Sequence, residues 1–232
     1  MAETPMQPLV LCLATQNRHK VEELLALLLT LAPDLQGQVK LTSLAELGIT
    51  DEVVEDGETF ADNALIKAKA AWLRTGLWSL SDDSGLMVDA LCGKPGIHSA
   101  RWGGEPRSDR RNIDKLLSDL HDVPDEKRQA QFVCTLCLYG QSKQSAAPQV
   151  VLREGICKGT LRTTLAGTSG FGYDPLFVPT AAELANAGLA AEKYGLTYAE
   201  LPADDKNRLS HRTRAVLALL PDLRRLIGQL ST

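Results

Sequence analysis

The stretch LVLCLATQNRHKVEELLALLLTL, residues 9–31, decides the fold class of this chain. Its first six residues, 9–14, form a continuous apolar run, as expected of a strand buried on both faces of a parallel sheet. After a short polar stretch, apolar residues recur at helical spacing until Pro33, which stops the predicted helix. A buried strand followed by a turn and a helix is the opening unit of an α/β fold.

Predicted strands and helices also follow one another through the rest of the chain. Thr59 and Asp62 form a variant capping box for a helix that ends at Gly76, while Ser108 and Ser210 are predicted to cap later helices. The alternation predicts one mixed α/β domain over residues 1–232, with two lobes around a cleft. The remaining predictions are strands over 39–43, 77–81, 129–139 and 149–161, loops over 93–106 and 167–175, helical structure over the alanine-rich residues 180–200, and a kink or restart of the last helix at Pro221.

Composition excludes several classes of protein. The 232 residues are 44% hydrophobic and 23% charged, which argues against a disordered chain. The net charge of -4 argues against tight, sequence-independent binding to nucleic acid. No apolar run approaches the length of about 18 residues that a membrane helix needs, and the first apolar run is too short for a signal peptide. We therefore expect a cytoplasmic protein with no membrane partner.

The five cysteines are expected to be reduced thiols packed in the core. Their number is odd and their neighbours are apolar, which argues against a disulfide framework. Cys134 and Cys137 form a C-x-x-C, but residues three apart in a strand face opposite sides, so the pair is not expected to bind zinc. The five positions are Cys12, Cys92, Cys134, Cys137 and Cys157.

The densest polar group at a predicted strand end is Asp82-Asp83-Ser84-Gly85. Adjacent carboxylates at the C-terminal edge of a strand can hold a divalent cation and activate water, and ligands of open α/β sheets lie outside that edge. Mg²⁺ suits such a site, since it prefers oxygen ligands and often takes only one or two carboxylates together with phosphates. The alternative is a plain turn, because Asp, Ser and Gly are turn residues.

The start of the first predicted helix offers further polar groups. The segment from Thr15 through Gln16, Asn17, Arg18 and His19 to Lys20 lies where a buried strand meets a helix, a place receptive to phosphate. The alternative there is an ordinary N-cap with a solvated lysine.

Asn63 and Lys67 are four residues apart and share one face of the next predicted helix. They could therefore face the same cleft as Asp83. The alternative is that this face of the helix is solvated, as is usual for a lysine on a helix.

The C-terminal half holds residues suited to a nucleobase. Phe171 could stack on a base and Asp174 could accept from a base N–H, within a glycine-rich loop that lets backbone approach a ligand. His211 and Arg212 could donate to a carbonyl or a phosphate, with Lys206 just upstream. An irregular loop and a plain helix cap are the alternatives at these two places.

Taken together, these segments closely resemble the inosine triphosphate pyrophosphatase family. The resemblance rests on motifs that occur in the family's order over about residues 9–226. They are T-x-N-x-x-K at Thr15–Lys20, D-N-A-x-x-K-A at Asp62–Ala68, DDSGL at Asp82–Leu86, PGIHSARW at Pro95–Trp102, GFGYDPLF at Gly170–Phe177 and SHR-x-x-A at Ser210–Ala215.

The resemblance implies an elongated, mixed-sheet, two-lobed α/β fold with the active site between the lobes, usually in a homodimer. It implies Mg²⁺-dependent hydrolysis of ITP, dITP and XTP to the monophosphate and pyrophosphate. Asp83 would be the proton acceptor, with Asp82 and Asp83 near the metal. The residues that would bind substrate are Thr15, Gln16, Asn17, Arg18, His19, Lys20, Lys67, Ser84, Phe171, Gly172, Tyr173, Asp174, Lys206, His211 and Arg212.

This chain departs from the family pattern in two places. Val54 stands where the family often has the first of two acids, so either Glu55 takes over as a metal ligand or water supplies the second metal contact. Residues 180–200 are longer than expected and could alter a lid over the base or the dimer contacts. Two other functions stay open: a related septum-inhibitor-type pyrophosphatase that prefers modified pyrimidines, and a nucleotide-binding regulator without turnover. Adjacent carboxylates argue against the regulator, since they repel a triphosphate unless a cation intervenes.

Overall fold

The structure is a computed structural model and describes residues 8–15, 18–142 and 145–230, without the side chains of Arg18, His19 and Leu230. The strands are β1 (Leu9–Leu13), β2 (Val39–Ser43), β3 (Trp78–Val88), β4 (Gln129–Gly140), β5 (Gln149–Leu161) and β6 (Phe177–Pro179). The α-helices are α1 (Arg18–Leu31), α2 (Phe60–Thr75), α3 (Asp109–Asp119), α4 (Ala181–Asn186), α5 (Ala203–Leu209) and α6 (His211–Leu230).

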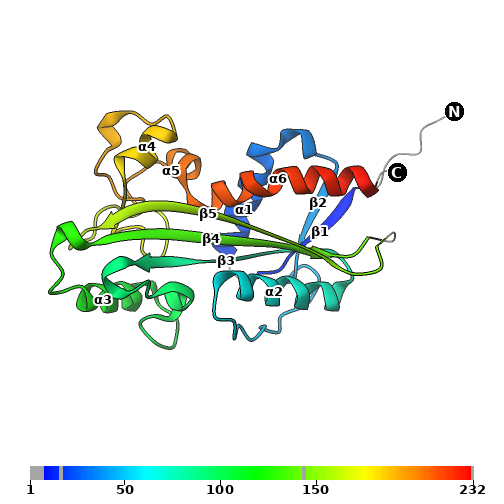
Figure 1. Ribbon diagram of the computed structural model, residues 1–232, viewed down its shortest axis with the longest axis horizontal. Helices are drawn as coiled ribbons and strands as arrows, with labels where there is room; N and C mark the ends of the chain where they lie inside the picture. Colours follow the sequence, from blue (N-terminus) through cyan, green and yellow to red (C-terminus); the bar gives the residue numbers. More distant parts are fainter. Residues whose placement is uncertain (1–7, 16–17, 143–144, 231–232) are drawn as a thin grey trace. The chain divides into compact units, whose positions relative to one another are not determined.

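The strands form one six-stranded sheet in the order β2-β1-β3-β4-β5-β6 (Figure 1). β1 is parallel to both of its neighbours, and β5 and β6 are antiparallel, so the sheet is mixed. This confirms the predicted α/β class and the strand–turn–helix unit at its start.

The chain divides into two compact units. The first unit comprises Met1–Asp83, Thr135–Glu154 and Ala215–Thr232, and the second comprises Ser84–Cys134 and Gly155–Arg214. The division falls inside β3, at the peptide bond between Asp83 and Ser84. The cleft expected between two lobes stays a prediction.

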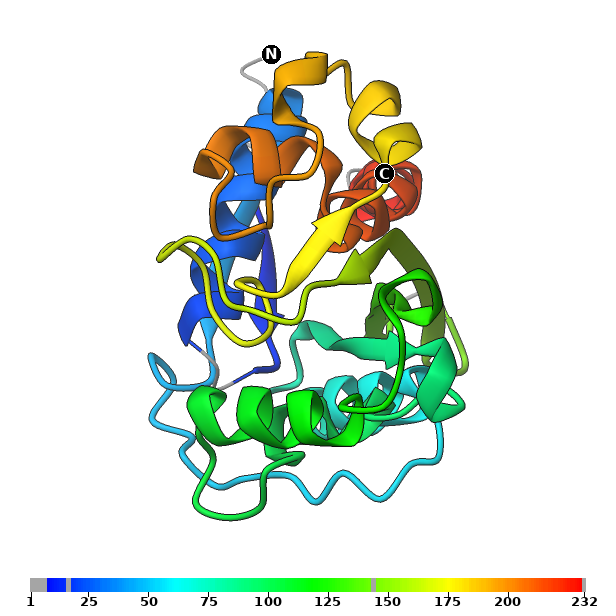
Figure 2. The same cartoon turned by 90° about the vertical axis from the view of Figure 1, so that its left-hand side faces the viewer.

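In the first unit, helices cover both faces of the sheet (Figures 1 and 2). Successive residues of a strand point to opposite faces. Cys12 of β1 accordingly packs with Ala71 of α2, whereas Leu11 lines a small apolar cavity with Leu28 of α1 and Leu223 of α6. The unit is therefore a three-layer sandwich, with α2 on one face and α1 and α6 on the other.

The second unit has its own apolar core under α3. Ile113 and Leu116 of this helix pack with residues of β3, β4 and β5. At its centre Phe132 contacts the Phe177 ring at 4.7 Å and stacks on the Tyr198 ring at 5.7 Å between centroids. Leu184 and Tyr198 belong to the same core, so the long segment 180–200 is part of the folded unit.

Two predictions of local structure were wrong. β3 runs without interruption through Asp82–Gly85, where a break had been expected. The segment 180–200 holds only the short helix α4 and a turn of 3-10 helix, because Gly188 and Gly195 adopt left-handed φ angles that end helices. Of the kink or restart predicted at Pro221, the restart does not occur, since helix α6 continues through this residue, and the kink stays a prediction. Pro221 has no N–H to donate to the backbone carbonyl of Leu217. Leu217 is exposed, so water can donate to this carbonyl instead.

The cysteine prediction was right at four positions. Cys12, Cys134, Cys137 and Cys157 are buried, whereas Cys92 is exposed after a 3-10 helix, and all five are free. Burial raises the pKa of Cys12 to about 11 and that of Cys137 and of Cys157 to about 12, so these thiols stay protonated.

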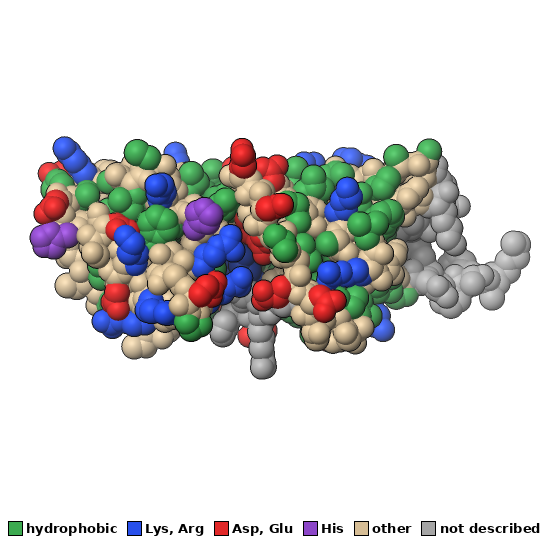
Figure 3. All heavy atoms as spheres, turned by 90° about the horizontal axis from the view of Figure 1, so that it is seen from below, with side chains coloured by type: hydrophobic (Ala, Val, Ile, Leu, Met, Phe, Trp, Pro, Cys, Tyr) green, Lys and Arg blue, Asp and Glu red, His purple; other side chains and the backbone are tan. Residues whose placement is uncertain are grey.

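Among the described residues, no helix is long and apolar enough to cross a membrane. Acidic and basic side chains are interspersed with hydrophobic ones on the face drawn in Figure 3. The described surface in that view therefore carries charges of both signs.

Candidate active site

The two aspartates lie in the middle of β3, beyond the last residue pair that this strand forms with β1. That pair is Leu13 with Leu80, and Ala14 N donates to Leu80 O at 2.8 Å. Asp82 and Asp83 therefore lie just past the C-terminal end of β1, where ligands of parallel strands are commonly bound. We expected the aspartates at the C-terminal end of their own strand, and this was wrong, since β3 continues past them. They do lie at the C-terminal end of a parallel strand, but that strand is β1.

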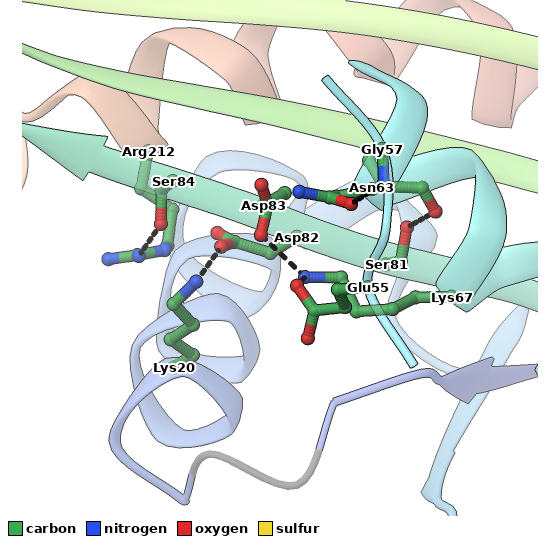
Figure 4. A network of polar contacts seen from close by, with 11 residues as sticks. Lys20, Glu55, Gly57, Asn63, Lys67, Ser81, Asp82, Asp83, Ser84 and Arg212 are labelled. Carbon is green, nitrogen blue, oxygen red and sulfur yellow. Dashed lines mark hydrogen bonds and ion pairs between the residues drawn. The ribbon is translucent and has the colours of Figure 1, made fainter. Parts of the chain in front are cut away.

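Each aspartate is paired with a lysine from a different helix (Figure 4). Lys20 of α1 donates to Asp82 Oδ1 at 2.6 Å, and Lys67 of α2 donates to Asp83 Oδ1 at 2.6 Å. Neighbouring residues of a strand face opposite sides, and α1 and α2 cover opposite faces of the sheet. The alternation of β3 thus explains why the two carboxylates receive cations from two helices.

Lys67 also joins the loop before α2 to this group. Its Nζ donates to Glu55 Oε2 at 3.0 Å. Burial lowers the pKa of Lys67, but the charges of Asp83 and Glu55 outweigh burial and raise it. Lys67 therefore stays charged, and Glu55 is held beside the aspartates. Val54 is 79% exposed, so position 54 points to solvent.

Asp83 has the properties of a proton acceptor. Its exposed fraction is 7%, and its Oδ2 has no hydrogen-bond partner within the part of the chain that the structure describes. Burial raises the pKa of Asp83 above its usual range, against the opposing charges of Lys67 and Lys20. A carboxylate with a raised pKa and one uncommitted oxygen is suited to general-base chemistry.

The residues around this group fit a hard cation that arrives with a phosphate. No group of three or more His, Cys, Asp or Glu able to hold a metal occurs among the described residues. However, Mg²⁺ often uses one or two carboxylates and leaves its other positions to water and phosphate. The neighbouring carboxylates of Asp82, Asp83 and Glu55 are donors of that kind. The donor set therefore suits Mg²⁺ bound together with a polyphosphate.

The predicted phosphate site at the start of α1 is only partly described. Thr15 follows β1 and the helix begins at Arg18, as the predicted strand–turn–helix unit requires. Gln16 and Asn17 lie outside the described residues, as do the side chains of Arg18 and His19. Lys20, in the first turn of the helix, is the described cation of this segment, and it contacts Asp82.

In the second unit, the predicted base-binding residues are tied to one another. Asp174 Oδ2 accepts from Phe171 N at 2.9 Å and from Lys206 Nζ at 2.8 Å. The Lys206 Nζ lies 5.2 Å from the centroid of the Phe171 ring. A Cβ at Gly170 would come within 2.1 Å of Asp174 Oδ2, so this loop requires glycine there. The ion pair thus fixes the loop that carries Phe171 and Gly172.

Tyr173 has a different environment from its neighbours in the loop. Its side chain is 3% exposed and its hydroxyl donates to Ser99 O at 2.9 Å. Burial raises the pKa of Tyr173, so the hydroxyl stays protonated and remains a donor. Tyr173 supports the loop from the core, and its predicted contact with the substrate stays a prediction.

The start of α6 holds the remaining predicted residues. Ser210 Oγ accepts from Thr213 N at 3.1 Å, which confirms the predicted cap. The His211 ring stacks on Phe132 with centroids 5.0 Å apart, and Arg212 Nη2 donates to Ser84 Oγ at 3.1 Å. Ser84 follows Asp83 directly in β3, so one strand carries both the candidate base and the partner of Arg212.

The sequence did not indicate which backbone groups support the site. Ser81 Oγ donates to Ala64 O at 2.6 Å and so joins β3 to α2. Gly57 N donates to Asn63 Oδ1 at 2.9 Å and so joins the Glu55 loop to the same helix. Ser81 is one residue from the acidic pair, but a serine in an apolar strand gives no signal of its own. The Gly57 interaction involves a backbone amide, which no side-chain pattern reports.

The fold and the site define an α/β protein with a buried carboxylate–lysine cluster suited to proton transfer beside a polyanion. The chain belongs to the Ham1 family, whose sequence profile matches residues 11–222. It is 44% identical over 220 residues to a dITP/XTP pyrophosphatase of Streptomyces coelicolor, with 94% of this chain and 98% of the relative covered.

Two solved structures have a similar fold. One is a HAM1 protein from Coxiella burnetii, with a TM-score of 0.75 and 34% identity over 94% of this chain and 99% of that chain. The other is described as a nucleoside-triphosphatase and dITP/XTP pyrophosphatase from Mycobacterium abscessus, with a TM-score of 0.68 and 41% identity over 92% of this chain and 100% of that chain.

Proposed function

We propose that this chain is a nucleoside triphosphate pyrophosphatase that hydrolyses dITP, ITP and XTP to the monophosphate and pyrophosphate. The single observation that carries the proposal is the buried Asp83, paired with Lys67 through one oxygen and without a described partner on the other. The activities printed for its relatives give the substrate class. Removal of deaminated purines from the nucleotide pool is the corresponding role.

In the proposed reaction, Asp83 takes a proton from the water that attacks the α-phosphorus. The new bond joins the water oxygen to this phosphorus, and the bond to the bridging oxygen breaks, so that pyrophosphate leaves with the electron pair. Lys20 and Lys67 offset the negative charge of the phosphates. Bound Mg²⁺, held by one or two of the carboxylates of Asp82, Asp83 and Glu55 together with water and phosphate, would neutralise further charge on the phosphates.

The residues of the second unit would select the base. A 6-oxo group on hypoxanthine or xanthine can accept from donors such as Arg212 and His211. The 6-amino group of adenine would leave such donors unpaired, and unpaired buried donors are costly. The loop of Phe171, Gly172 and Asp174, fixed by Lys206, would contact the base or the sugar.

We also propose a cellular compartment and an oligomeric state for the enzyme. Free thiols at all five cysteines are typical of the cytoplasm, where we place it. We propose a homodimer without a nucleic-acid partner, in line with the family resemblance and the net charge of -4.

A pyrophosphate-release assay with ITP, XTP, GTP, ATP and dUTP, with and without Mg²⁺, tests the function. We expect Mg²⁺-dependent release from ITP and XTP. Release from dUTP alone would favour the pyrimidine-directed alternative, and binding without release would favour the regulator.

Asp83→Asn tests the assignment of the base. We expect kcat to fall by about 10²- to 10⁴-fold while the dissociation constant of a non-hydrolysable ITP analogue changes little. Undiminished turnover of this variant would exclude Asp83 as the proton acceptor.

A further inference from the structure

Asn63 is a buried polar side chain at this site that the proposed reaction has not used. It lies in the first turn of α2 and is 1% exposed. Its Oδ1 accepts from Gly57 N at 2.9 Å, and its Nδ2 has no hydrogen-bond partner among the described residues. A buried unsatisfied donor is costly and calls for an explanation.

The orientation of the Asn63 amide is fixed by the backbone. Exchanging its oxygen and nitrogen would place two donors, Nδ2–H and Gly57 N–H, against each other. The loop is packed tightly here, since a Cβ at Gly57 would lie 2.5 Å from Asp62 Cβ and 2.8 Å from Asn63 Oδ1. The donor end of the amide therefore points away from the loop and toward Asp83, as Figure 4 shows.

The Asn63 donor and the Asp83 acceptor are complementary. Asp83 Oδ2 is the carboxylate oxygen without a partner among the described residues, and Lys67 occupies Oδ1. A buried N–H donor and a buried oxygen acceptor, both uncommitted and on facing side chains, can together bind one water molecule. Water can accept from the amide while it donates to the carboxylate.

We propose that Asn63 is a catalytic residue that holds the attacking water against Asp83. This inference rests on the proposed function. The Nδ2–H donates to one lone pair of the water, whose proton goes to Asp83 Oδ2. The other lone pair forms the bond to the α-phosphorus as pyrophosphate leaves with the bridging oxygen. Asn63 neither gains nor loses a proton.

Asn63→Asp separates this role from a structural one. The aspartate keeps an oxygen that accepts from Gly57 N–H, but its carboxylate cannot donate to water. We expect kcat for ITP to fall about 10- to 100-fold, with KM changed less than about threefold, because a misplaced nucleophile affects the chemical step. Thr59→Ala is the control, since it removes the cap of the same helix, and the side-chain hydrogen bonds it loses are to Asp62 and not to the side chain of Asn63 or of Asp83.

Kinetics, melting temperature and binding of a non-hydrolysable ITP analogue are measured for each variant. A loss of kcat in Asn63→Asp, with binding and fold retained and with Thr59→Ala fully active, supports the inference. Wild-type kcat in Asn63→Asp overturns it and leaves Asn63 a structural role through Gly57. An equal loss of kcat in Thr59→Ala also overturns it.

Asp83→Asn distinguishes the failure of this inference from the failure of the proposed function. If Asp83→Asn is inactive while Asn63→Asp is fully active, the inference alone is wrong. If Asp83→Asn itself is fully active, the assigned base is wrong and the role of Asn63 beside it is overturned as well.

Discussion

At the scale of single residues, burial and charge act on Asp83 in opposite directions. Burial raises its pKa, while Lys67 and Lys20 favour the ionised form. The balance leaves the carboxyl easier to protonate than an exposed aspartate. The pairing through Oδ1 fixes the side chain, and Oδ2 is then the oxygen that remains for chemistry.

The first prediction concerns the pH dependence of turnover. A general base works in its deprotonated form, so activity is present above the pKa of Asp83 and is lost as the pH falls through it. Because this pKa is raised from 3.8, the acid limb of the kcat/KM profile is expected above pH 3.8. The measurement is the rate of pyrophosphate release against pH, with circular dichroism at each pH as the control for unfolding. An acid limb at or below 3.8 in folded protein would contradict this assignment.

Single residues were predictable where their chemistry leaves few choices. The acidic pair in an apolar segment, and a lysine one helical turn after Asn63, led to the correct expectation that Lys67 faces Asp83. Tyr173 shows the limit of such reasoning. An aromatic residue in a glycine-rich loop can point to a ligand or to the core, and only the packing around Ser99 settles that this one points inward.

At the scale of elements, β3 shows how turn-forming residues can occur inside a strand. Asp, Ser and Gly favour turns in isolation. In this strand, lysines from α1 and α2 neutralise the two carboxylates. A Cβ at Gly85 would lie 2.4 Å from Ser99 Oγ, so the glycine allows a close approach of two segments, not a reversal of the chain. Such partners are distant in sequence, and the local pattern could not reveal them.

The second prediction concerns the start of α2. Thr59 Oγ1 accepts from Asp62 N at 3.1 Å, and Asp62 Oδ2 accepts from Thr59 N at 3.1 Å, which confirms the predicted capping box. Thr59→Ala is expected to cost about 1 kcal/mol of stability. For a chain of this length, that corresponds to a melting temperature lower by about 2–4 °C.

Thermal unfolding followed by circular dichroism measures this effect. Thr59→Ser, which keeps the hydroxyl, is the matched control and should melt close to the wild type. A Thr59→Ala protein that melts at the wild-type temperature would show that the capping box adds little to the stability of α2.

At the scale of the whole molecule, the order of the motifs was more informative than any one of them. Each segment alone was compatible with a turn, a cap or a solvated face. Their order along the chain indicated the family, to which the chain belongs. The sheet order β2-β1-β3-β4-β5-β6 was not predictable in the same way, because it depends on pairings between segments far apart in sequence.

The most direct test of the central claim is hydrolysis of ITP in water enriched in oxygen-18, with both products analysed by mass spectrometry. If water activated at Asp83 attacks the α-phosphorus, the label enters inosine monophosphate and the pyrophosphate stays unlabelled. Asp83→Asn should form neither product at an appreciable rate. Label in the pyrophosphate, or release of orthophosphate in its place, would contradict the proposed reaction.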